Sequence, residues 1–337
     1  MPIFTVLSPA YNHEKYIGEC IQSVLLQSFT DWEMIILDDG SSDKTGEIAA
    51  KFALEDSRIK YHSQKNHGIF RLAETYNKGL SMARGRYISI LECDDRWEPY
   101  KLQRQNEILE SRPEVVVCWG RAQALVAETH EIQALSPKEG VNNTTLWPNC
   151  PIGTILNALY LENMIPAVTL TIRRSILEEI GGFTQPAEFP TTDLPTLLEL
   201  ALKGEFYFDE AILAQWRVYS IQITKMYPVK MVNQRWKHVL NHLLTCSLAI
   251  KSHLTVTEKQ INRHFRLRLL TAYATSGRYK LMRGDYSGAR KDYLRAIFFP
   301  SPTGVIWRLR AITGFFFSLF HLNIEGLARI LGKVSYK

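Results

Sequence analysis

The chain has 337 residues, 46% of them hydrophobic and 22% charged, which is typical of a globular protein with one large core or two smaller ones. This composition excludes wholesale disorder, and five cysteines without CxxC spacing indicate neither a zinc site nor a disulfide framework. Residues 1–227 contain 21 Lys and Arg against 30 Asp and Glu, whereas residues 228–337 contain 19 against 4. The basic last third predicts an anionic partner, either nucleic acid or an anionic membrane surface.

Apolar runs alternate with helical periodicity over the first hundred residues, which predicts a Rossmann-like sheet with helices on both faces. The predicted strands are Phe4–Leu7, Trp32–Leu37, Arg58–His62 and Arg86–Leu91. The predicted helices are Tyr16–Gln27, Asp43–Leu54 with Ser41 or Ser42 as its cap, and Leu72–Ala83. Because ligands of such sheets bind beyond the carboxyl ends of the strands, the polar residues that follow these strands are candidates for a site.

Strand and helix patterns continue to about residue 217. The further predicted helices are Lys101–Arg112, Arg174–Ile180 stopped by Gly181-Gly182, and Leu194–Lys203. The further predicted strands are Val115–Trp119, Val168–Ile172 and one or two within Phe206–Arg217. Weak periodicity and several turn formers predict an irregular excursion over Arg121–Asn149. A first domain is therefore expected over residues 1–227.

After Pro228 the strand patterns stop, and residues 228–337 are predicted to form a basic, all-helical C-terminal region. One tetratricopeptide-like helical hairpin is indicated by the spacing of Gly284-Asp285-Tyr286, Ala289, Tyr293, Ala296 and Pro300. Residues 311–322 are the most apolar stretch, yet a membrane span needs about 20 apolar residues. Trp307, Arg308 and Arg310 beside this stretch favour a helix lying in the membrane interface, and burial against the first domain is the alternative.

Carboxylates gather where the fourth predicted strand ends, at Glu92, Asp94 and Asp95. Oxygen ligands of this kind favour Mg²⁺ or Mn²⁺, which proteins commonly hold through one or two carboxylates and the phosphates of a substrate. A solvated loop is the alternative for an isolated pair of aspartates. Asp38 and Asp39 follow the second strand in the same way. A donor that carries phosphate is therefore the first hypothesis.

An ordered series of motifs extends over roughly residues 3–224. Its members are Val6-Leu7-Ser8-Pro9-Ala10-Tyr11-Asn12, Ile36-Leu37-Asp38-Asp39-Gly40-Ser41-Ser42-Asp43, Asn66-His67-Gly68, Asn77, Gly85, the acidic strand end, Trp97, Pro99, Lys101, Leu102, Ile172-Arg173-Arg174, Gly181-Gly182-Phe183, Asp193 and Trp216-Arg217. In this order they resemble the bacterial-type family 2 glycosyltransferases. The resemblance implies the GT-A fold, a mixed Rossmann-like sheet with helices on both faces, and inverting transfer of a sugar from a nucleotide-diphosphate donor.

The resemblance also implies roles for single residues, with Mn²⁺ or Mg²⁺ as the cofactor. Asp95 would be a metal ligand, Asp94 would bind the ribose or assist the metal, and Asp39 would recognise the donor base. The other donor-site candidates are Pro9, Ala10, Tyr11, Asn12 and Arg71, and the secondary candidates are Glu92, Asp38, Lys78, Trp216 and Arg217. Glu92 departs from the family because an aspartate commonly begins its acidic strand end.

An inverting transfer needs a base that takes the proton of the acceptor hydroxyl as this hydroxyl attacks the anomeric carbon. By resemblance Asp193 holds that position, and Thr192 stands where the family usually has glutamate. Asp is also a favourable helix N-cap, so capping of the helix predicted from Leu194 is the other expected role of Asp193. The two roles are compatible.

The predicted function is transfer of a sugar from a nucleotide-diphosphate sugar, a UDP-sugar, to a glycan or lipid-linked glycan acceptor in cell-surface polysaccharide or glycoconjugate synthesis. The start of the chain shows no signal-peptide pattern, so we expect a cytoplasmic protein held peripherally at the inner face of the cell membrane by its basic region. We expect no nucleic-acid partner, because aromatic and basic residues are not interleaved as single-strand binding requires.

Two other functions stay open at this point. A nucleotidyltransferase also uses a Rossmann-like sheet and a metal, although Ser8–His13 lacks the glycines of a phosphate loop. A non-catalytic scaffold with a relic GT-A domain is the second, and the retained acidic residues argue against it. Acceptor choice is expected to rest with Arg121–Pro166 and the helical region, and the patterns predict no particular oligomeric state.

Overall fold

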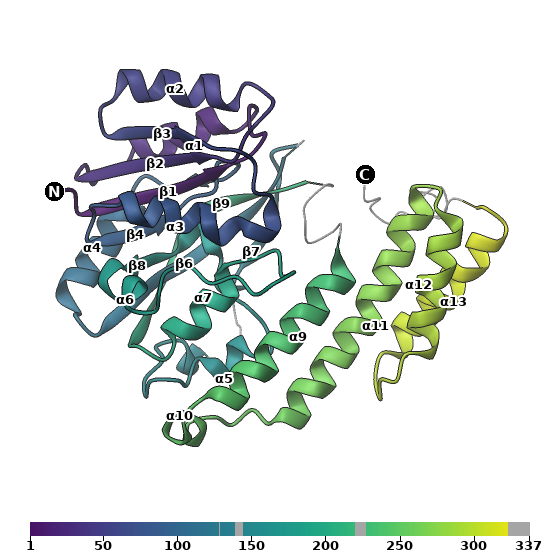
Figure 1. Ribbon diagram of the computed structural model, residues 1–337. Coiled ribbons are helices and arrows are strands. Elements are labelled where there is room, and N and C mark those ends of the chain that lie inside the picture. The colour runs from purple at the N-terminus through teal and green to yellow at the C-terminus, as the bar shows by residue number, and fades with distance from the viewer. Residues whose placement is uncertain (128, 139–143, 220–226, 323–337) are drawn as a thin grey trace. The chain divides into compact units, whose positions relative to one another are not determined.

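The computed structural model describes residues 1–127, 129–138, 144–219 and 227–322. By its contacts the chain divides into two compact units. The first unit consists of Met1–Val218 together with Cys246–Thr255, and the second of Tyr219–Thr245 and Val256–Lys337. Within the described residues the first unit combines a sheet with helices, whereas the second contains helices alone (Figure 1). The short helix α10 (Leu248–Ser252) belongs by its contacts to the first unit.

Strands and helices alternate along the first unit. The strands of its described residues are β1 (Phe4–Ala10), β2 (Trp32–Asp38), β3 (Ile59–Ser63), β4 (Tyr87–Ile90), β5 (Arg96–Trp97), β6 (Val115–Val126), β7 (Ile132–Ser136), β8 (Thr171–Arg173) and β9 (Glu205–Val218). The α-helices before α10 are α1 (Ile17–Leu25), α2 (Thr45–Glu55), α3 (Leu72–Met82), α4 (Lys101–Ser111), α5 (Leu156–Leu159), α6 (Arg174–Glu179) and α7 (Asp193–Leu200). Three single 3₁₀ turns are η1 (Ile69–Arg71), η2 (Thr144–Leu146) and η3 (Ala167–Thr169).

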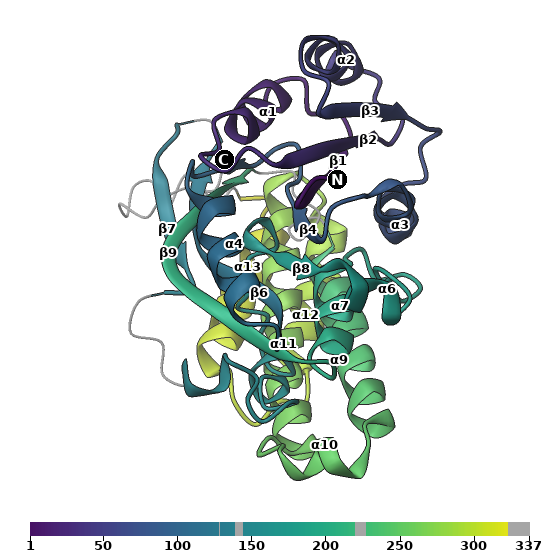
Figure 2. The same ribbon diagram turned by 90° about the vertical axis from the view of Figure 1, so that its left-hand side faces the viewer.

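The strands form one mixed sheet in the order β3-β2-β1-β4-β8-β6-β9-β5, with β7 paired to β6. Strands β3, β2, β1 and β4 run parallel, which brings their carboxyl ends to the same edge. Strand β8 is antiparallel to both β4 and β6, whereas β9 runs parallel to β6 over most of its length. Figure 2 shows β9 as a long curved strand. The sheet is therefore mixed, as the sequence predicted.

Alternate residues of the parallel strands face opposite layers of helices. Phe4 and Val6 of β1, like Met34 and Ile36 of β2, are buried in a cluster that includes residues of α1, α2 and α4. The residues between them point the other way, because α3 contacts both strands and a Cβ added at Gly79 of α3 would lie 2.5 Å from a methyl carbon of Leu37. Helices thus cover both faces of the sheet, and its interior strands are apolar on each side.

The second unit consists, in its described residues, of four helices. They are α9 (Pro228–Thr245), α11 (Glu258–Met282), α12 (Tyr286–Phe298) and α13 (Val305–Leu319). Helix α11 begins with a capping box of Thr257 and Gln260, and Asp285 caps α12 by accepting a hydrogen bond from Gly288 N. Helices α11 and α12 form a hairpin, and α13 packs against both. Among the described helices, none is long and apolar enough to cross a bilayer.

Two predictions about secondary structure are wrong. The segment predicted to be irregular from Arg121 contains the end of β6 and all of β7, because pairing with β9 continues as far as Val126. Residues 128 and 139–143 of that segment lie outside the described residues. The strand predicted over Val168–Ile172 is shorter and begins later: Val168 and Thr169 lie in the turn η3, and only Thr171–Arg173 pairs with its neighbours.

Two predicted helix caps are also wrong. Helix α2 begins at Thr45 without a side-chain cap, and neither Ser41 nor Ser42 caps it. Ser41 Oγ instead accepts a hydrogen bond of 2.9 Å from Asn12 N, in the loop after β1. Helix α7 begins at Asp193 itself and has no side-chain cap, because the Asp193 carboxylate is turned to other partners.

Candidate active site

The acidic residues lie beside the ends of β1 and β2 because the parallel register continues past the strands. Asp39 N donates to Ala10 O at 2.9 Å, which joins the loop after β2 to the end of β1. On the other side of β1, Leu91 N donates to Leu7 O at 3.1 Å and Cys93 N donates to Pro9 O at 3.3 Å. The segments after β1, β2 and β4 are therefore held together at one edge of the sheet.

The segment after β4 carries a cluster of three carboxylates. One oxygen each of Glu92, Asp94 and Asp95 lies within 4.8 Å of the others, and the two aspartates are buried. Burial together with the charges of Asp94 and Glu92 raises the pKa of Asp95 well above its usual value. Burial and Asp94 likewise raise the pKa of Glu92 to about 7. Close carboxylates in a buried site favour a divalent cation, so this set can hold Mg²⁺ or Mn²⁺.

Arg217, at the end of β9, holds this cluster from the other half of the sheet. Its backbone N donates to Asp95 Oδ1 at 2.8 Å, and its guanidinium donates to the carbonyl oxygen of Asp94 and to the carboxylate of Glu19. The guanidinium also lies 4.7 Å from the ring of Tyr16. The side chain is almost fully buried, so its position is fixed from several sides. Its neighbour Trp216 is half-buried against the core.

Asp193 faces the same site from the start of α7. Asn163 Nδ2 donates to its Oδ2 at 2.8 Å, and the hydroxyl of Thr191 donates to its Oδ1. The charge of Asp193 contributes, after burial and Asp94, to the raised pKa of Glu92, so the two carboxylates are close enough to interact. Hydrogen bonds from two neutral donors hold both oxygens of this carboxylate, which orients it as a general base requires.

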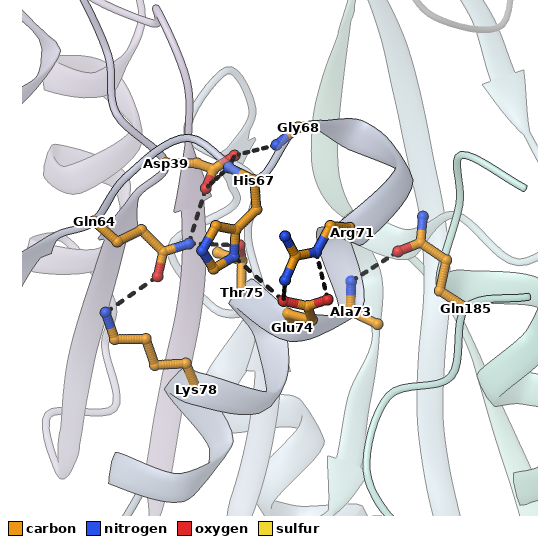
Figure 3. A network of polar contacts seen from close by, with 10 residues as sticks. All are labelled: Asp39, Gln64, His67, Gly68, Arg71, Ala73, Glu74, Thr75, Lys78 and Gln185. Atoms are coloured by element: carbon orange, nitrogen blue, oxygen red, sulfur yellow. Dashed lines mark hydrogen bonds and ion pairs between the residues drawn. The ribbon is translucent and has the colours of Figure 1, made fainter. Parts of the chain in front are cut away.

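Asp39 is the centre of a polar network after β2 (Figure 3). Its carboxylate accepts hydrogen bonds from Gln64 Nε2 at 2.8 Å, from His67 N at 3.0 Å and from Gly68 N at 3.1 Å. Gly40, at φ +75, lets this loop approach Asn66 so closely that an added Cβ would lie 2.8 Å from Asn66 N. Asp39 therefore fixes the loop of residues 64–68 beside the end of β2.

Arg71 and Lys78 lie in the same network, and both have partners within it (Figure 3). The guanidinium of Arg71 forms two hydrogen bonds of 2.6 Å with Glu74, and Lys78 Nζ donates to Gln64 Oε1 at 3.1 Å. Arg71 is exposed, so this pair is a weak surface contact that a phosphate could replace. Neither side chain lies within a buried charge pair.

The loop after β1 interlocks with the loop after β2. Asn12 has φ +56, its backbone N donates to Ser41 Oγ, and its Oδ1 accepts a 2.8 Å hydrogen bond from Ser42 N. Tyr11 beside it is half exposed. Asp38 is buried and accepts hydrogen bonds from Ser41 N and from the Tyr61 hydroxyl. Asp38 and Asn12 thus shape the loops around the site, and Tyr11 is open to a ligand.

Four residues of the site were absent from the sequence-based list. Tyr76 donates its hydroxyl to Glu92 Oε1 at 3.1 Å, Glu19 pairs with Arg217, and Asn163 binds Asp193. Gln185 joins two loops, because it accepts from Ala73 N (Figure 3). It also donates to the carbonyl oxygens of Ile69 and Phe189. No short motif indicates these residues, since each forms its hydrogen bond with a residue that is distant in the sequence.

Comparison with known proteins identifies the class of this enzyme. The family described as Glycosyl transferase family 2 matches residues 5–181, and the chain belongs to this family. The putative teichuronic acid biosynthesis glycosyltransferase TuaG of Bacillus subtilis is 30% identical over 233 residues, which cover 66% of this chain and 82% of TuaG. The chain is therefore a glycosyltransferase, and a nucleotidyltransferase is set aside.

Two solved structures share the fold. S. aureus TarS 1-349 in complex with UDP-GlcNAc superposes with a TM-score of 0.59 at 15% identity, covering 99% of this chain and 93% of that one. The mannosyltransferase PcManGT from Pyrobaculum calidifontis, in complex with GDP-Man and Mn²⁺, gives a TM-score of 0.56 at 16% identity, covering 95% and 87%. Together with the family, they confirm the predicted GT-A fold with a helical C-terminal region.

Proposed function

We propose that this glycosyltransferase moves a sugar from a UDP-sugar to a glycan or lipid-linked glycan acceptor, with inversion at the anomeric carbon. The observation that carries the proposal is the meeting of two features at one sheet edge. The three-carboxylate cluster after β4 suits a metal-bound diphosphate, and Asp193 is a separate carboxylate close to it. Metal-assisted departure and deprotonation of an acceptor need these two features.

The carboxylates fit a divalent cation by number, spacing and burial. Asp95 and Asp94 would hold Mn²⁺ or Mg²⁺, with Glu92 as a further ligand or as a hydrogen-bond partner. When bound, the cation would offset the charge that develops on the leaving diphosphate. Arg217 keeps Asp95 oriented through its backbone N. Tyr76 does the same for Glu92 through its hydroxyl.

The donor nucleotide would lie between the ends of β1 and β2. Pro9, Ala10, Tyr11 and Asn12 would line it on one side, and Asp39, which fixes the 64–68 loop, on the other. Arg71 would exchange its exposed partner Glu74 for a phosphate oxygen, and Lys78 is a second candidate. The UDP-GlcNAc and UDP complexes of TarS support a UDP-sugar as the donor. Because PcManGT was solved with GDP-Man, GDP-sugars are included in the donor screen.

Asp193 would take the proton of the acceptor hydroxyl as its oxygen attacks the anomeric carbon from the face opposite the diphosphate. The bond from that carbon to the diphosphate oxygen breaks, and nucleoside diphosphate departs. Asn163 and Thr191 hold the two oxygens of Asp193 during this step. The relation to TuaG supports an acceptor in cell-surface polysaccharide or glycoconjugate synthesis.

The enzyme would work in the cytoplasm at the inner face of the cell membrane, where lipid-linked acceptors are found. The support is electrostatic, because the described residues of the second unit contain 15 Lys and Arg against 3 Asp and Glu. Clusters of basic residues bind anionic lipid surfaces with about 1 kcal/mol for each residue near the surface. This part of the proposal is tested separately from transfer.

A screen of UDP- and GDP-sugars with Mn²⁺ or Mg²⁺ tests the chemistry, with release of nucleoside diphosphate as the readout. At least one donor should be turned over only with the metal. Asp95→Ala should lose both turnover and metal binding, whereas Asp193→Ala should keep metal and donor binding and lose only transfer. Turnover of every active donor in EDTA, or unchanged turnover in either variant, would overturn the proposed mechanism.

A further inference from the structure

Helix α13 has one face packed inside the second unit. Ala311, Gly314 and Ser318 are buried, and Trp307 packs against the same cluster. A Cβ added at Gly314 would lie 2.3 Å from the ring of Tyr293 in α12, so the two helices touch closely along this line. The spacing of three and four residues places all of these positions on one side of the helix. The packing therefore fixes the rotation of α13 about its axis.

The opposite side of α13 is exposed, and it is apolar. Nine residues from 305 to 320 are exposed, and only Arg310 and Thr313 among them are polar. The other seven form what we call the outer face, which consists of Val305, Ile306, Leu309, Ile312, Phe316, Leu319 and Phe320. Their side chains are between 37% and 71% exposed. An exposed helix face is normally polar, so this one indicates an apolar partner.

The charges of the second unit point to an anionic partner for this face. All three acidic residues of the second unit's described part already have local partners: Glu258 accepts from Asn262, Asp285 caps α12, and Asp292 pairs with Lys280 at 2.6 Å. The 15 Lys and Arg of this part, among them exposed Lys259, Arg263 and Arg266 of α11, far outnumber them. A second copy of this unit would carry the same excess of positive charge and would be repelled.

We propose that the outer face of α13 inserts into the interface of an anionic lipid bilayer, with the helix lying in the membrane plane. This inference rests on the proposed membrane location and names the element that achieves it. Helix α13, from Val305 to Leu319, is about 22 Å long, and its apolar face would reach the boundary of headgroups and acyl chains, about 5–10 Å deep. Arg310, whose guanidinium lies 4.7 Å from the Trp307 ring, would meet lipid phosphates at the edge of that face.

Flotation of the full chain with vesicles tests the inference. Wild-type protein should bind vesicles of phosphatidylcholine with phosphatidylglycerol and bind phosphatidylcholine alone more weakly. Leu309→Ser combined with Phe316→Ser removes two outer-face side chains without touching the packed face, and should weaken binding at least about tenfold. The control is Leu26→Ser combined with Leu54→Ser, two leucines of the first unit that are more exposed than Leu309 and Phe316, and this variant should bind as wild type does.

Thermal unfolding and turnover of the donor in solution should be unchanged in both double variants. If the outer-face variant unfolds, Phe320→Ser at the C-terminal end of α13 repeats the test with a smaller loss. Binding of the outer-face variant equal to wild type would overturn the inference and leave the membrane location intact. Absence of wild-type binding would overturn both, with transfer judged by its own assay. Dimers that dissociate in the variant would show that the outer face joins two copies instead.

Discussion

Two loops at the same sheet edge carry aspartates and differ in how the charge is compensated. After β2, Asp39 accepts hydrogen bonds from Gln64, His67 and Gly68, so its charge is already stabilised by protein groups. After β4, Asp95 has one such bond, from Arg217 N, and faces two other carboxylates. The difference shows that position at a strand end does not by itself indicate a metal site. Carboxylate charge that protein donors leave unstabilised does indicate one, because a cation can offset it.

The largest expected effect is that of Asp95→Asn. Loss of this proposed metal ligand should lower transfer by about 10³-fold or more. The same change should raise the melting temperature measured in EDTA, because the raised pKa of Asp95 means that its charge destabilises the fold. The asparagine oxygen can still accept the hydrogen bond from Arg217 N.

The direction of the pKa shift of Asp95 also predicts how the stability of the wild type in EDTA depends on pH. The folded state binds the Asp95 proton more tightly than the unfolded state, so wild-type stability in EDTA should fall as pH rises above the unfolded pKa of about 3.9. Mn²⁺ should restore that stability in wild type and leave Asp95→Asn unchanged. Equal melting curves for the two proteins in EDTA across this pH range would contradict the contrast between the loops.

Asn163→Ala should have the next largest effect on transfer. Asn163 holds Asp193 Oδ2 at 2.8 Å, and losing this donor frees the orientation of the carboxylate. We expect kcat to fall by about tenfold with little change in the donor KM. Asn163→Asp should be worse than Asn163→Ala, since a second charge would face Asp193. A purely structural role would lower the free energy of unfolding and leave kcat of the folded protein unchanged.

Asp39→Asn should destabilise the fold, whereas Asp95→Asn should stabilise it in EDTA. The amide nitrogen of asparagine would face the N–H groups of His67 or Gly68, leaving donors without an acceptor. We expect a loss of about 1–3 kcal/mol in the free energy of unfolding and a higher KM for the donor, with metal binding retained. Urea unfolding and a metal titration would measure this. If Asp39→Asn instead stabilised the protein, the charge of Asp39 would not be stabilised by its loop, and the two loops would not differ in this respect.

Secondary-structure elements that depend on neighbouring residues could be predicted from the sequence. Contacts between residues far apart in the sequence could not. Apolar runs ending in Asp39 and in Asp94 and Asp95 located the sheet edge, because strand periodicity and strand ends are visible in neighbouring residues. The contact between Arg217 and Glu19 spans 198 residues, and no spacing rule anticipates it.

The wrong predictions have the same origin. Strand β6 extends to Val126 despite local turn formers, since β9 pairs along it and tertiary contact outweighs local preference. Asp193 does not cap its helix, because Asn163, 30 residues earlier, takes one of its oxygens. Asp39 and Asp95 look alike in sequence, and only the folded loops show that one is satisfied and the other is not.

Lys101 allows burial to be separated from the effect of like charges, and we expect the smallest effect on transfer there. This lysine is fully buried, its Nζ donates to Gln105 Oε1 at 2.7 Å, and it lies 4.0 Å above the Trp97 ring. Burial lowers its pKa from 10.5 to about 7. No carboxylate contributes to that shift, unlike the shifts at Asp95 and Glu92.

Between these two pKa values the unfolded chain binds the Lys101 proton and the folded chain does not. The contribution of Lys101 to the wild-type free energy of unfolding should therefore rise with pH from about 7 to about 10.5, at no more than about 1.4 kcal/mol per pH unit. Lys101→Met keeps the packing and removes this contribution, so the two proteins should differ most in favour of methionine at pH 6, and the difference should be smaller at pH 9. Urea unfolding at both pH values measures it, and parallel pH dependences would show that burial alone does not perturb charged groups in this core.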